Sequence, residues 1–525
     1  IAIEGCCHNQ LELIYKTIDY IEKEKNIKID LLLICGDVQT IRNRTDLDST
    51  SMPDHYKELG TFYKYYSGEL KAPIPTIFIG GNHEASNYLW ELYYGGWVCE
   101  NVYYLGCSGV VNFGGLRIGG LSGIYKQRDY GLGHFETFPY TNDTIRSIYH
   151  VRRYEMFKLN MIRQPIDILL SHDWPEDITR FGDENRLKRI KQHLAPDIER
   201  VRLGNPYCGL LLHKLKPRYW FAAHLHVKFA ALIPHNVPQT ETAPNPDEIP
   251  ISLDEIPISL DEVVIDQNEV DDPDPDELPS FIDDIDNAND VIETDEIQII
   301  ESEETPIAND ITAELPLNLE DLEEFVTSSI PSSIPSNTQS SFTRFLSLDK
   351  CLPGREFLQI LDFPEANGPL EFSYDEEWLA ITKATHQFFS VTQKQVPLPT
   401  ESEMRDTLDT SQEWVRNNIL QRDSGLLIPK NFLPTAPAHN SSNLQECNLS
   451  VPFLNPQTVA FTQMLEIENK INPDGQTVAF TQMLEIENKI NPDGQTRGHW
   501  GRQWVRYFGN IFRLASGLIP AQIHI

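Results

Sequence analysis

Long apolar runs are missing from this 525-residue sequence, and none reaches the roughly 18 to 20 residues that a membrane-spanning helix needs. The start also lacks a basic segment followed by an apolar stretch, the pattern of a secretory signal. The 8 cysteines show no paired spacing, which excludes a disulfide-rich secreted scaffold and favours a reducing compartment. We therefore expect no stable membrane association. Because the sequence opens inside an expected strand without a Met, we expect the natural chain to begin a few residues upstream.

Basic residues are scarce overall, with 43 Lys and Arg against 78 Asp and Glu and a formal net charge of -35. The imbalance lies in the second part of the chain. Residues 1–230 carry 28 basic and 27 acidic side chains, whereas the remainder carries 15 and 51. Residues 117–230 even hold 19 basic against 12 acidic side chains, an excess that suits a polyanion. The acidic whole-chain charge therefore does not exclude a nucleic-acid substrate.

Five apolar runs have the length of β-strands, and each is followed by polar residues. They are Ile1–Glu4, Leu31–Cys35, Thr76–Gly80, Ile166–Leu170 and Tyr219–Ala222. Four are almost entirely apolar, as strands buried on both faces are. Between the first two, residues 11–21 place apolar side chains at helical spacing, which predicts a β-α-β unit. With a glycine-rich stretch at 102–124 that predicts short strands and turns, the pattern indicates a layered α/β domain ending near residue 235.

No Lys or Arg occurs between residues 229 and 343, a stretch that holds 30 Asp and Glu. Such a composition cannot bury enough apolar surface to offset the entropy of ordering it, so we predict a disordered acidic linker over residues 236–341. Order is expected to resume at 342 and to continue to about 395 as a small C-terminal domain. Its own core would include Leu346, Leu348, Phe357 and Trp378. Residues 396–525 are expected to form a poorly ordered tail.

The tail contains an identical tandem repeat. Gln457–Gly475 recurs without change as Gln476–Gly494, a period of 19 residues. Each copy predicts one helix, with Thr458 or Thr477 as the N-cap and Asn-Pro-Asp-Gly as the stop signal. Perfect identity points to a recent duplication or an assembly error, and we assign the repeat no function.

Residue types that bind metals follow all five predicted strands. In chain order they are Cys6-Cys7-His8, Gly36-Asp37, Gly81-Asn82-His83-Glu84, Ser171-His172-Asp173 and His224-Leu225-His226. In open α/β sheets, ligand sites form just beyond the carboxyl ends of the strands. Any one of these clusters alone is more often structural, but five clusters after five strands indicate one shared site.

In this order the clusters resemble the ligand set of the calcineurin-like metallophosphoesterases, which implies a β-sandwich flanked by helices and two divalent metal ions. By this resemblance one ion takes Cys6, His8, Asp37 and His226, and the other takes Asp37, Asn82, His172 and His224. Two cations roughly 3.5 to 4 Å apart clamp the attacking and leaving oxygens of a phosphoryl displacement, and Asp37 would bridge them. His83 has no metal to bind in this assignment, which frees it to protonate the leaving oxygen as general acid.

Cys6 departs from most of the superfamily, which places Asp at this position. A thiolate is a softer ligand that disfavours Mg²⁺, so we expect Fe²⁺ or Zn²⁺ as cofactors, with Mn²⁺ able to substitute. Cys7 should point into the opposite layer, because side chains alternate along an extended backbone. A cysteine ligand at this position is a hallmark of one branch of the superfamily, the RNA lariat debranching enzymes. The chain resembles that branch at residues 117–126, 144–152, 215–229, 343–353 and 374–380, and overall over about 1–235 and 342–391.

This resemblance implies a nuclear enzyme that hydrolyses the 2′-5′ phosphodiester at the branch point of excised intron lariats. Residues 125–154 correspond in position to the family's lariat-recognition loop and combine aromatic with basic side chains. Unstacked bases lie on aromatic faces, while guanidinium groups meet phosphates. The candidate RNA contacts are Tyr125, Lys126, Arg128, Tyr149, His150 and Arg152. The alternative is a packed insertion whose aromatic residues are core.

The metal site alone leaves two other functions open. A phosphoesterase acting on protein phosphates or cyclic nucleotides would need the same ligands but no recognition loop. A catalytically inactive scaffold would use the fold for protein binding and the acidic segment as its working part, but such proteins usually lose ligands or the acid. All seven ligand positions and His83 hold competent residues, which favours an enzyme.

Overall fold

The structure is a computed structural model that describes residues 1–235, 341–364, 366–439 and 452–471. Nearly all of the predicted linker, the second copy of the 19-residue repeat and the end of the chain therefore lie outside the described residues. Within the described ranges, no helix combines the length and the apolar character that crossing a membrane requires.

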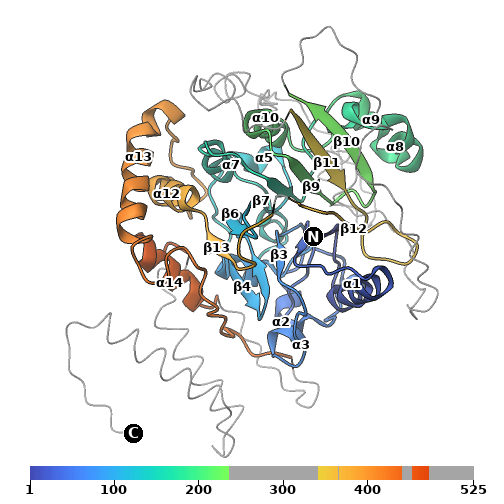
Figure 1. The fold of residues 1–525 in the computed structure, drawn as a ribbon, viewed down its shortest axis with the longest axis horizontal. Helices are drawn as coiled ribbons and strands as arrows, with labels where there is room; N and C mark the ends of the chain where they lie inside the picture. The colour runs from blue at the N-terminus through green and yellow to red at the C-terminus, as the bar shows by residue number, and fades with distance from the viewer. Residues whose placement is uncertain (236–340, 365, 440–451, 472–525) are drawn as a thin grey trace, which may run out of the picture.

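Two mixed β-sheets occupy the centre of the molecule (Figure 1). The first sheet has the order β12-β1-β2-β3-β5-β4, formed by Leu358–Ile360, Ala2–Glu4, Leu32–Ile34, Thr76–Phe78, Val102–Tyr104 and Gly96–Cys99. The second sheet has the order β10-β11-β9-β8-β7-β6-β13, formed by Phe229–Pro234, Phe342–Ser347, Tyr219–Ala222, Ile168–Ser171, Leu116–Leu121, Ser108–Phe113 and Ser373–Tyr374. Strands β1, β2, β3 and β5 run parallel, as do β7, β8, β9 and β11.

Helices surround the two sheets. The α-helices are α1 (Leu11–Lys25), α2 (Arg44–Leu47), α3 (Phe62–Tyr66), α4 (Ser86–Glu91), α5 (Gln127–Tyr130), α6 (Thr144–Ser147), α7 (Arg153–Asn160), α8 (Glu184–Ile190), α9 (Ala195–Glu199), α10 (Pro206–Leu215), α12 (Glu376–Thr385), α13 (Glu401–Asn418) and α14 (Pro456–Leu465). Short 3-10 helices cover Asp54–Tyr56, Ile178–Phe181, Gln192–Leu194 and His386–Phe388.

Three apolar clusters explain the layers. Between the sheets, Ile3 and Leu33 of the first sheet belong to one cluster with Leu170 and Phe221 of the second. A second cluster joins the outer face of the first sheet to α1, α3 and α4, and a third joins the outer face of the second sheet to α7, α10 and α12. Each sheet is therefore buried on both faces, as the apolar runs of the sequence predict. The α/β sandwich flanked by helices is confirmed, with all five predicted strands and the first helix in place.

The segment after residue 342 differs from the expected small domain with a core of its own. Strand β11 lies inside the second sheet, antiparallel to β10 and parallel to β9, and β12 extends the first sheet beside β1. Phe345 packs into the cluster on the helix side of the second sheet, whereas its neighbour Leu346 packs between the sheets. Because alternate residues of β11 face two different layers, its apolar side chains complete the cores of the first half.

The segment after residue 396 contains helices, in contrast to the expected poorly ordered tail. Helix α13 begins with a capping box in which Thr400 and Glu403 satisfy each other's backbone N–H groups. Helix α14 begins at Pro456 and is capped by Asn455, whose side chain accepts from the backbone N–H of Gln457 at 3.0 Å. The predicted N-cap Thr458 is therefore wrong, because Asn-Pro supplies a cap and a first helical residue three positions earlier.

Candidate metal centre

The predicted ligands come together where the strands end. Cys6 and His8 follow β1, Asp37 follows β2, and Asn82 follows β3. His172 follows β8 of the second sheet, and His224 and His226 follow β9. Because β1, β2 and β3 are parallel, as are β8 and β9, each set of carboxyl ends lies at one edge of its sheet. The sandwich brings these two edges together.

The backbone at several proposed ligands adopts left-handed conformations that are rare for residues other than glycine. Asp37, His224 and His226 have φ angles of 51°, 64° and 45°. Such left-handed residues cost about 1–3 kcal/mol each and persist only where the surrounding structure enforces them. Close packing explains the adjacent glycines: a Cβ on Gly36 would lie 2.2 Å from Nδ1 of His172, and one on Gly81 would lie 2.1 Å from Oδ1 of Asp37. These sharp turns direct the side chains of the proposed ligands towards one another.

The first predicted ligand set forms a compact group. One ligand atom from each of Cys6, His8, Asp37 and His226 lies within 4.8 Å of the others. The two imidazole Nε2 atoms of His8 and His226 are 3.1 Å apart, and Nε2 of His8 is 3.6 Å from Oδ2 of Asp37. The backbone N–H of His224 donates to the Cys6 sulfur at 3.2 Å, which stabilises electron density on that sulfur.

The second predicted set surrounds His172. Its Nε2 atom lies 3.0 Å from Oδ1 of Asn82 and 3.4 Å from Oδ2 of Asp37. Its Nδ1 atom donates to the carbonyl of Cys35 at 2.7 Å, since a carbonyl oxygen can only accept. This bond orients the ring with Nε2 towards Asp37, as outer partners of metal-binding histidines commonly do. The ring of His224 lies beside it, with centroids 5.1 Å apart.

Asp37 is the electrostatic centre of the site. Burial alone would raise its pKa, but His172, His83 and His8 outweigh burial and hold the pKa well below its usual range. The same pairing raises the pKa of His172 against the opposing effect of burial. Oδ2 of Asp37 is buried and makes no hydrogen bond within the described part of the chain. A buried anionic oxygen among sulfur and nitrogen ligands fits a divalent cation.

His83 lies at the rim of this group and is 7% exposed. Its backbone N–H donates to Oδ1 of Asp37 at 2.8 Å, and its ring Nδ1 donates to the carbonyl of Ser51 at 2.7 Å. Its ring centroid is 5.8 Å from that of His8. With Nδ1 occupied by a carbonyl acceptor, Nε2 is the nitrogen that can exchange a proton with a substrate.

Glu84 is a functional candidate that the sequence analysis gave no role. Its carboxylate accepts from the backbone N–H groups of Val38 and Gln39 at 2.9 and 2.8 Å, and from Gly81 at 3.1 Å. Burial, then the neighbouring Asp37, raises its pKa to about 7 in spite of these bonds. Glu84 therefore ties the turn after β2 to the turn after β3. Its signal in the sequence is its place directly after His83 in a ligand cluster.

The predicted recognition loop, residues 125–154, adjoins this site. A cavity is lined by Gly80, Gly81 and Glu84 on one side and by Tyr149, His150 and Arg152 on the other. The Tyr149 hydroxyl lies 3.2 Å from that of Ser51. The loop therefore lies next to the segments that carry the proposed ligands, and its role in recognition stays a prediction.

The six candidate RNA contacts divide into two groups. Arg152 is fully buried, pairs with Glu136 and donates to the Ser147 carbonyl at 2.8 Å; His150 is 3% exposed and bonds Asp129 at 2.6 Å. These two side chains hold the loop in shape, together with the largely buried Tyr149. Lys126, Tyr125 and Arg128 reach its surface: the Arg128 side chain is 66% exposed, and Tyr125 is half-buried against Tyr130 and Tyr207.

Comparison with known proteins accounts for both halves of the structure. The calcineurin-like phosphoesterase family matches residues 1–228, and the C-terminal domain of lariat debranching enzymes matches residues 340–470. The chain belongs to the lariat debranching enzyme family. The debranching-enzyme match extends to 470, beyond the limit of 391 expected from the sequence, and therefore includes α13 and α14.

Lariat debranching enzymes from distant organisms resemble this family member along most of its length. The Arabidopsis thaliana enzyme is 41% identical over 467 residues, which cover 89% of this chain and 85% of the relative. The Homo sapiens enzyme is 38% identical over 470 residues, covering 89% and 69%. The Schizosaccharomyces pombe enzyme is 39% identical over 476 residues, covering 90% and 96%.

Proposed function

We propose that this chain hydrolyses the 2′-5′ phosphodiester of branched RNA, the junction left in an excised intron lariat, and that it works in the nucleus, where such RNA arises. The observation that carries the proposal is the combination, in one chain, of a phosphoesterase ligand group containing Cys6 with the C-terminal domain of lariat debranching enzymes. All seven ligand positions and His83 hold competent side chains at the strand ends, which argues against an inactive scaffold.

Two divalent cations fit the ligands described above. Cys6, His8, Asp37 and His226 would hold one, and Asp37, Asn82, His172 and His224 the other. When bound, such cations supply Lewis-acid stabilisation of a phosphate and lower the pKa of water. The sulfur of Cys6 favours Fe²⁺ or Zn²⁺ over Mg²⁺ in the first site, with Mn²⁺ able to substitute.

His83 is proposed as the general acid. Its Nδ1 donates to the Ser51 carbonyl and its ring lies 5.8 Å from that of His8, so Nε2 would be the atom that passes a proton to the leaving ribose oxygen. Its backbone N–H donates to Oδ1 of Asp37, which ties the proposed acid to the carboxylate that both cations would share. This arrangement separates the proton donor from the groups that would hold the cations.

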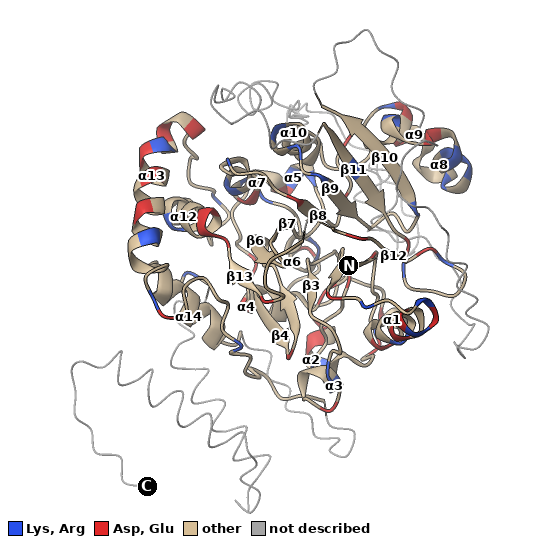
Figure 2. Ribbon diagram, in the orientation of Figure 1, with Lys and Arg blue, Asp and Glu red and all other residues tan. Residues whose placement is uncertain are grey.

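Substrate choice is assigned to the loop at 125–154. Arg128 and Lys126 would contact RNA phosphates, and the ring of Tyr125 would stack on an unpaired base. His150 and Arg152 would contribute to RNA binding by holding the loop in shape. A second basic surface lies on α8, which carries Arg186, Lys188 and Arg189 (Figure 2). Both surfaces fall within residues 117–230, where basic side chains are in excess.

The test is a cleavage assay on RNA that carries both a 2′-5′ and a 3′-5′ linkage at one adenosine. The purified chain is loaded separately with Fe²⁺, Zn²⁺, Mn²⁺ or Mg²⁺, and linear RNA of the same sequence serves as the control. We expect selective loss of the 2′-5′ bond, with Mg²⁺ the weakest cofactor. Hydrolysis of a simple phosphodiester with the branch left intact would retain the metal site and refute the substrate.

A further inference from the structure

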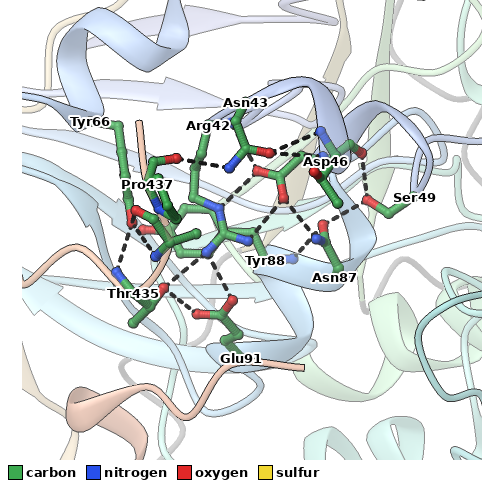
Figure 3. Close-up of polar contacts among 12 residues, drawn as sticks. Arg42, Asn43, Asp46, Ser49, Tyr66, Asn87, Tyr88, Glu91, Thr435 and Pro437 are labelled. Carbon is green, nitrogen blue, oxygen red and sulfur yellow. Dashed lines mark hydrogen bonds and ion pairs between the residues drawn. The ribbon is translucent and has the colours of Figure 1, made fainter. Parts of the chain in front are cut away.

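A buried hydrogen-bonded cluster connects residues 435–437 to the segment that follows Asp37 (Figure 3). Its centre is the guanidinium of Arg42, which is fully buried and lies 4.0 Å from the ring centroid of Tyr88. Nε and Nη2 of Arg42 donate to the carboxylate of Asp46 at 2.8 and 2.9 Å. Nη1 donates to Glu91 at 2.8 Å and to the Thr435 hydroxyl at 2.9 Å. The cluster therefore joins segments almost 400 residues apart in sequence.

Thr435 closes this cluster from the C-terminal side. Its hydroxyl donates to the second oxygen of Glu91 at 2.6 Å while accepting from Arg42. The backbone around it is fixed as well: the N–H of Thr435 donates to the Tyr66 hydroxyl at 2.7 Å, and Asn43 donates to the Pro437 carbonyl at 2.8 Å. Thr435 is 1% exposed, so solvent does not replace its hydroxyl if it is removed.

The other end of the cluster reaches His83. Asn87 donates to Oδ1 of Asp46 at 2.7 Å and accepts from the Ser49 hydroxyl at 2.6 Å. The backbone N–H of Ser49 also donates to the Asp46 carbonyl at 3.0 Å. Two residues later, the carbonyl of Ser51 accepts the Nδ1–H of His83 at 2.7 Å. The position of Asp46 thus sets the position of the carbonyl that orients the proposed acid.

We infer that Thr435 is a positioning residue for His83, acting through Glu91, Arg42 and Asp46 on the Ser51 carbonyl. The inference rests on the proposed function, because it concerns the proton donor of that reaction. Burial raises the pKa of Glu91 to about 7, and the bonds from Arg42 and Thr435 oppose that rise. Removing the Thr435 hydroxyl therefore favours neutral Glu91 and leaves Arg42 less firmly held.

The experiment compares Thr435→Val, which removes the hydroxyl and keeps the shape, with Thr435→Ser, which keeps the hydroxyl. Thr382→Val is the matched control, because Thr382 is 3% exposed and its hydroxyl makes no hydrogen bond within the described residues. Each variant is assayed on branched RNA and on a nitrophenyl phosphodiester, whose leaving group needs no proton. A metal-content measurement and an unfolding midpoint accompany each assay.

We expect Thr435→Val to slow cleavage of branched RNA by about 10-fold to 10²-fold, the usual effect of a displaced catalytic group. The nitrophenyl ester should be cleaved at close to the wild-type rate, and Thr435→Ser should restore the RNA rate. In a His83→Ala background, Thr435→Val should add no further loss, because the group that it positions is gone. Thr435→Ala supplies the same comparison if the valine variant does not fold.

An equal loss on both substrates, or a further loss in the His83→Ala background, would overturn the inference. The proposed function fails separately, if the wild-type chain leaves branched RNA intact and hydrolyses other phosphodiesters. In that case a dialkyl phosphodiester replaces the RNA as the assay substrate, because its alkoxide leaving group must also be protonated. The ratio of its rate to that of the nitrophenyl ester then decides whether Thr435 acts through His83.

Discussion

Cys6 and His83 are the two residues that most restrict which reactions the site could catalyse. The Cys6 side chain is fully buried and contributes one of the four ligand atoms of the compact group. His83 lies beside that group with its Nδ1 bonded to a backbone carbonyl. In the proposed function, Cys6 would influence which cation binds, and His83 would influence how the leaving group departs.

Replacing Cys6 with Asp should shift the metal preference towards Mn²⁺ or Mg²⁺, because a carboxylate is a harder ligand than a thiolate. The measurement is the order in which the four cations restore activity to metal-free protein. Cys7→Ala, at a buried neighbour that faces another cluster, should leave the order unchanged. An unchanged order in Cys6→Asp would remove Cys6 from the ligand set.

Replacing His83 with Ala should slow cleavage by roughly 10² to 10⁴-fold, the usual contribution of general acid catalysis. Metal content, measured on the same preparation, should match that of the wild type, because the proposed ligands are other residues. His55→Ala, at an exposed histidine whose ring lies tilted against that of Tyr56, is the control for loss of an imidazole. Wild-type cleavage rates in His83→Ala would assign the proton to another group.

The grouping of the proposed ligands could be predicted from the sequence, because each follows an apolar run and parallel strands end at one edge of a sheet. Glu84 and Ser51 could not be assigned roles in the same way. Glu84 acts by accepting three backbone N–H groups, and Ser51 acts through its main-chain carbonyl. The place of Glu84 in a ligand cluster marks it as a candidate, but the sequence does not display the backbone contacts through which either residue acts.

At the scale of elements, the C-terminal segment is held to the rest by buried polar contacts as well as by strand pairing. Arg117 on β7 donates to both oxygens of Asp375 at 2.7 Å and to Glu377 on α12 at 2.6 Å. Its side chain is 10% exposed, so the ion pair is largely shielded from solvent. Residues 390–394 also hold the predicted recognition loop, because the carbonyls of Gln393 and Ser390 accept from the N–H groups of Gly133 and His134.

Replacing Arg117 with Met should destabilise the fold by about 3–5 kcal/mol, because two buried carboxylates lose their cation. Urea unfolding is the measurement. Arg163→Met is the matched control: Arg163 pairs with Asp409 at 3.1 Å, but the two side chains are 29% and 62% exposed. Such an exposed pair contributes about 0–1 kcal/mol. Equal losses of unfolding free energy in the two variants would mean that burial of the Arg117 ion pairs does not add to stability.

The sequence predicted the type of an element correctly where the pattern of its own residues determines it. The prediction failed where an element depends on contacts with residues far along the chain. The five predicted strands of the first half and α1 follow their own apolar patterns. The place of β11 between β9 and β10 depends on backbone pairing, which leaves no local signal. Helix α13 has a moderately apolar face and many charges, so its composition resembles that of a tail until its capping box is considered.

On the scale of the whole molecule, the described residues before 236 and after 340 form one structure. Strands β10 and β11 pair in antiparallel register from Phe229–Ser347 to Pro234–Phe342, and His235 donates its N–H to the Ser341 carbonyl at 2.8 Å. His235 and Ser341, the residues on either side of 236–340 in the sequence, therefore lie at hydrogen-bond distance from each other. Strands β10 and β11 pair as a β-hairpin does, although the 107 residues 235–341 separate them in the sequence.

Replacing residues 236–340 with a short glycine-containing turn should preserve the fold and the cleavage rate. Closing a shorter loop costs less entropy, by about 0.6 kcal/mol per halving of length, so stability should be equal or slightly higher. The measurements are the unfolding midpoint and kcat/KM on branched RNA. Deleting residues 236–347 instead, which also removes β11, should prevent folding, and a folded product would refute the central position of that strand.

The position of β11 also sets the order of events during synthesis. When a ribosome has made residues 1–235, β9 and β10 exist, but the strand that lies between them has not been translated. At about 5–20 residues per second, the segment up to 340 delays that strand by about 5–20 s. The nascent second sheet passes this interval with unpaired backbone edges. We expect chaperones to bind this exposed sheet until β11 emerges. The half with the candidate metal site should therefore complete its folding only after β11 has been made.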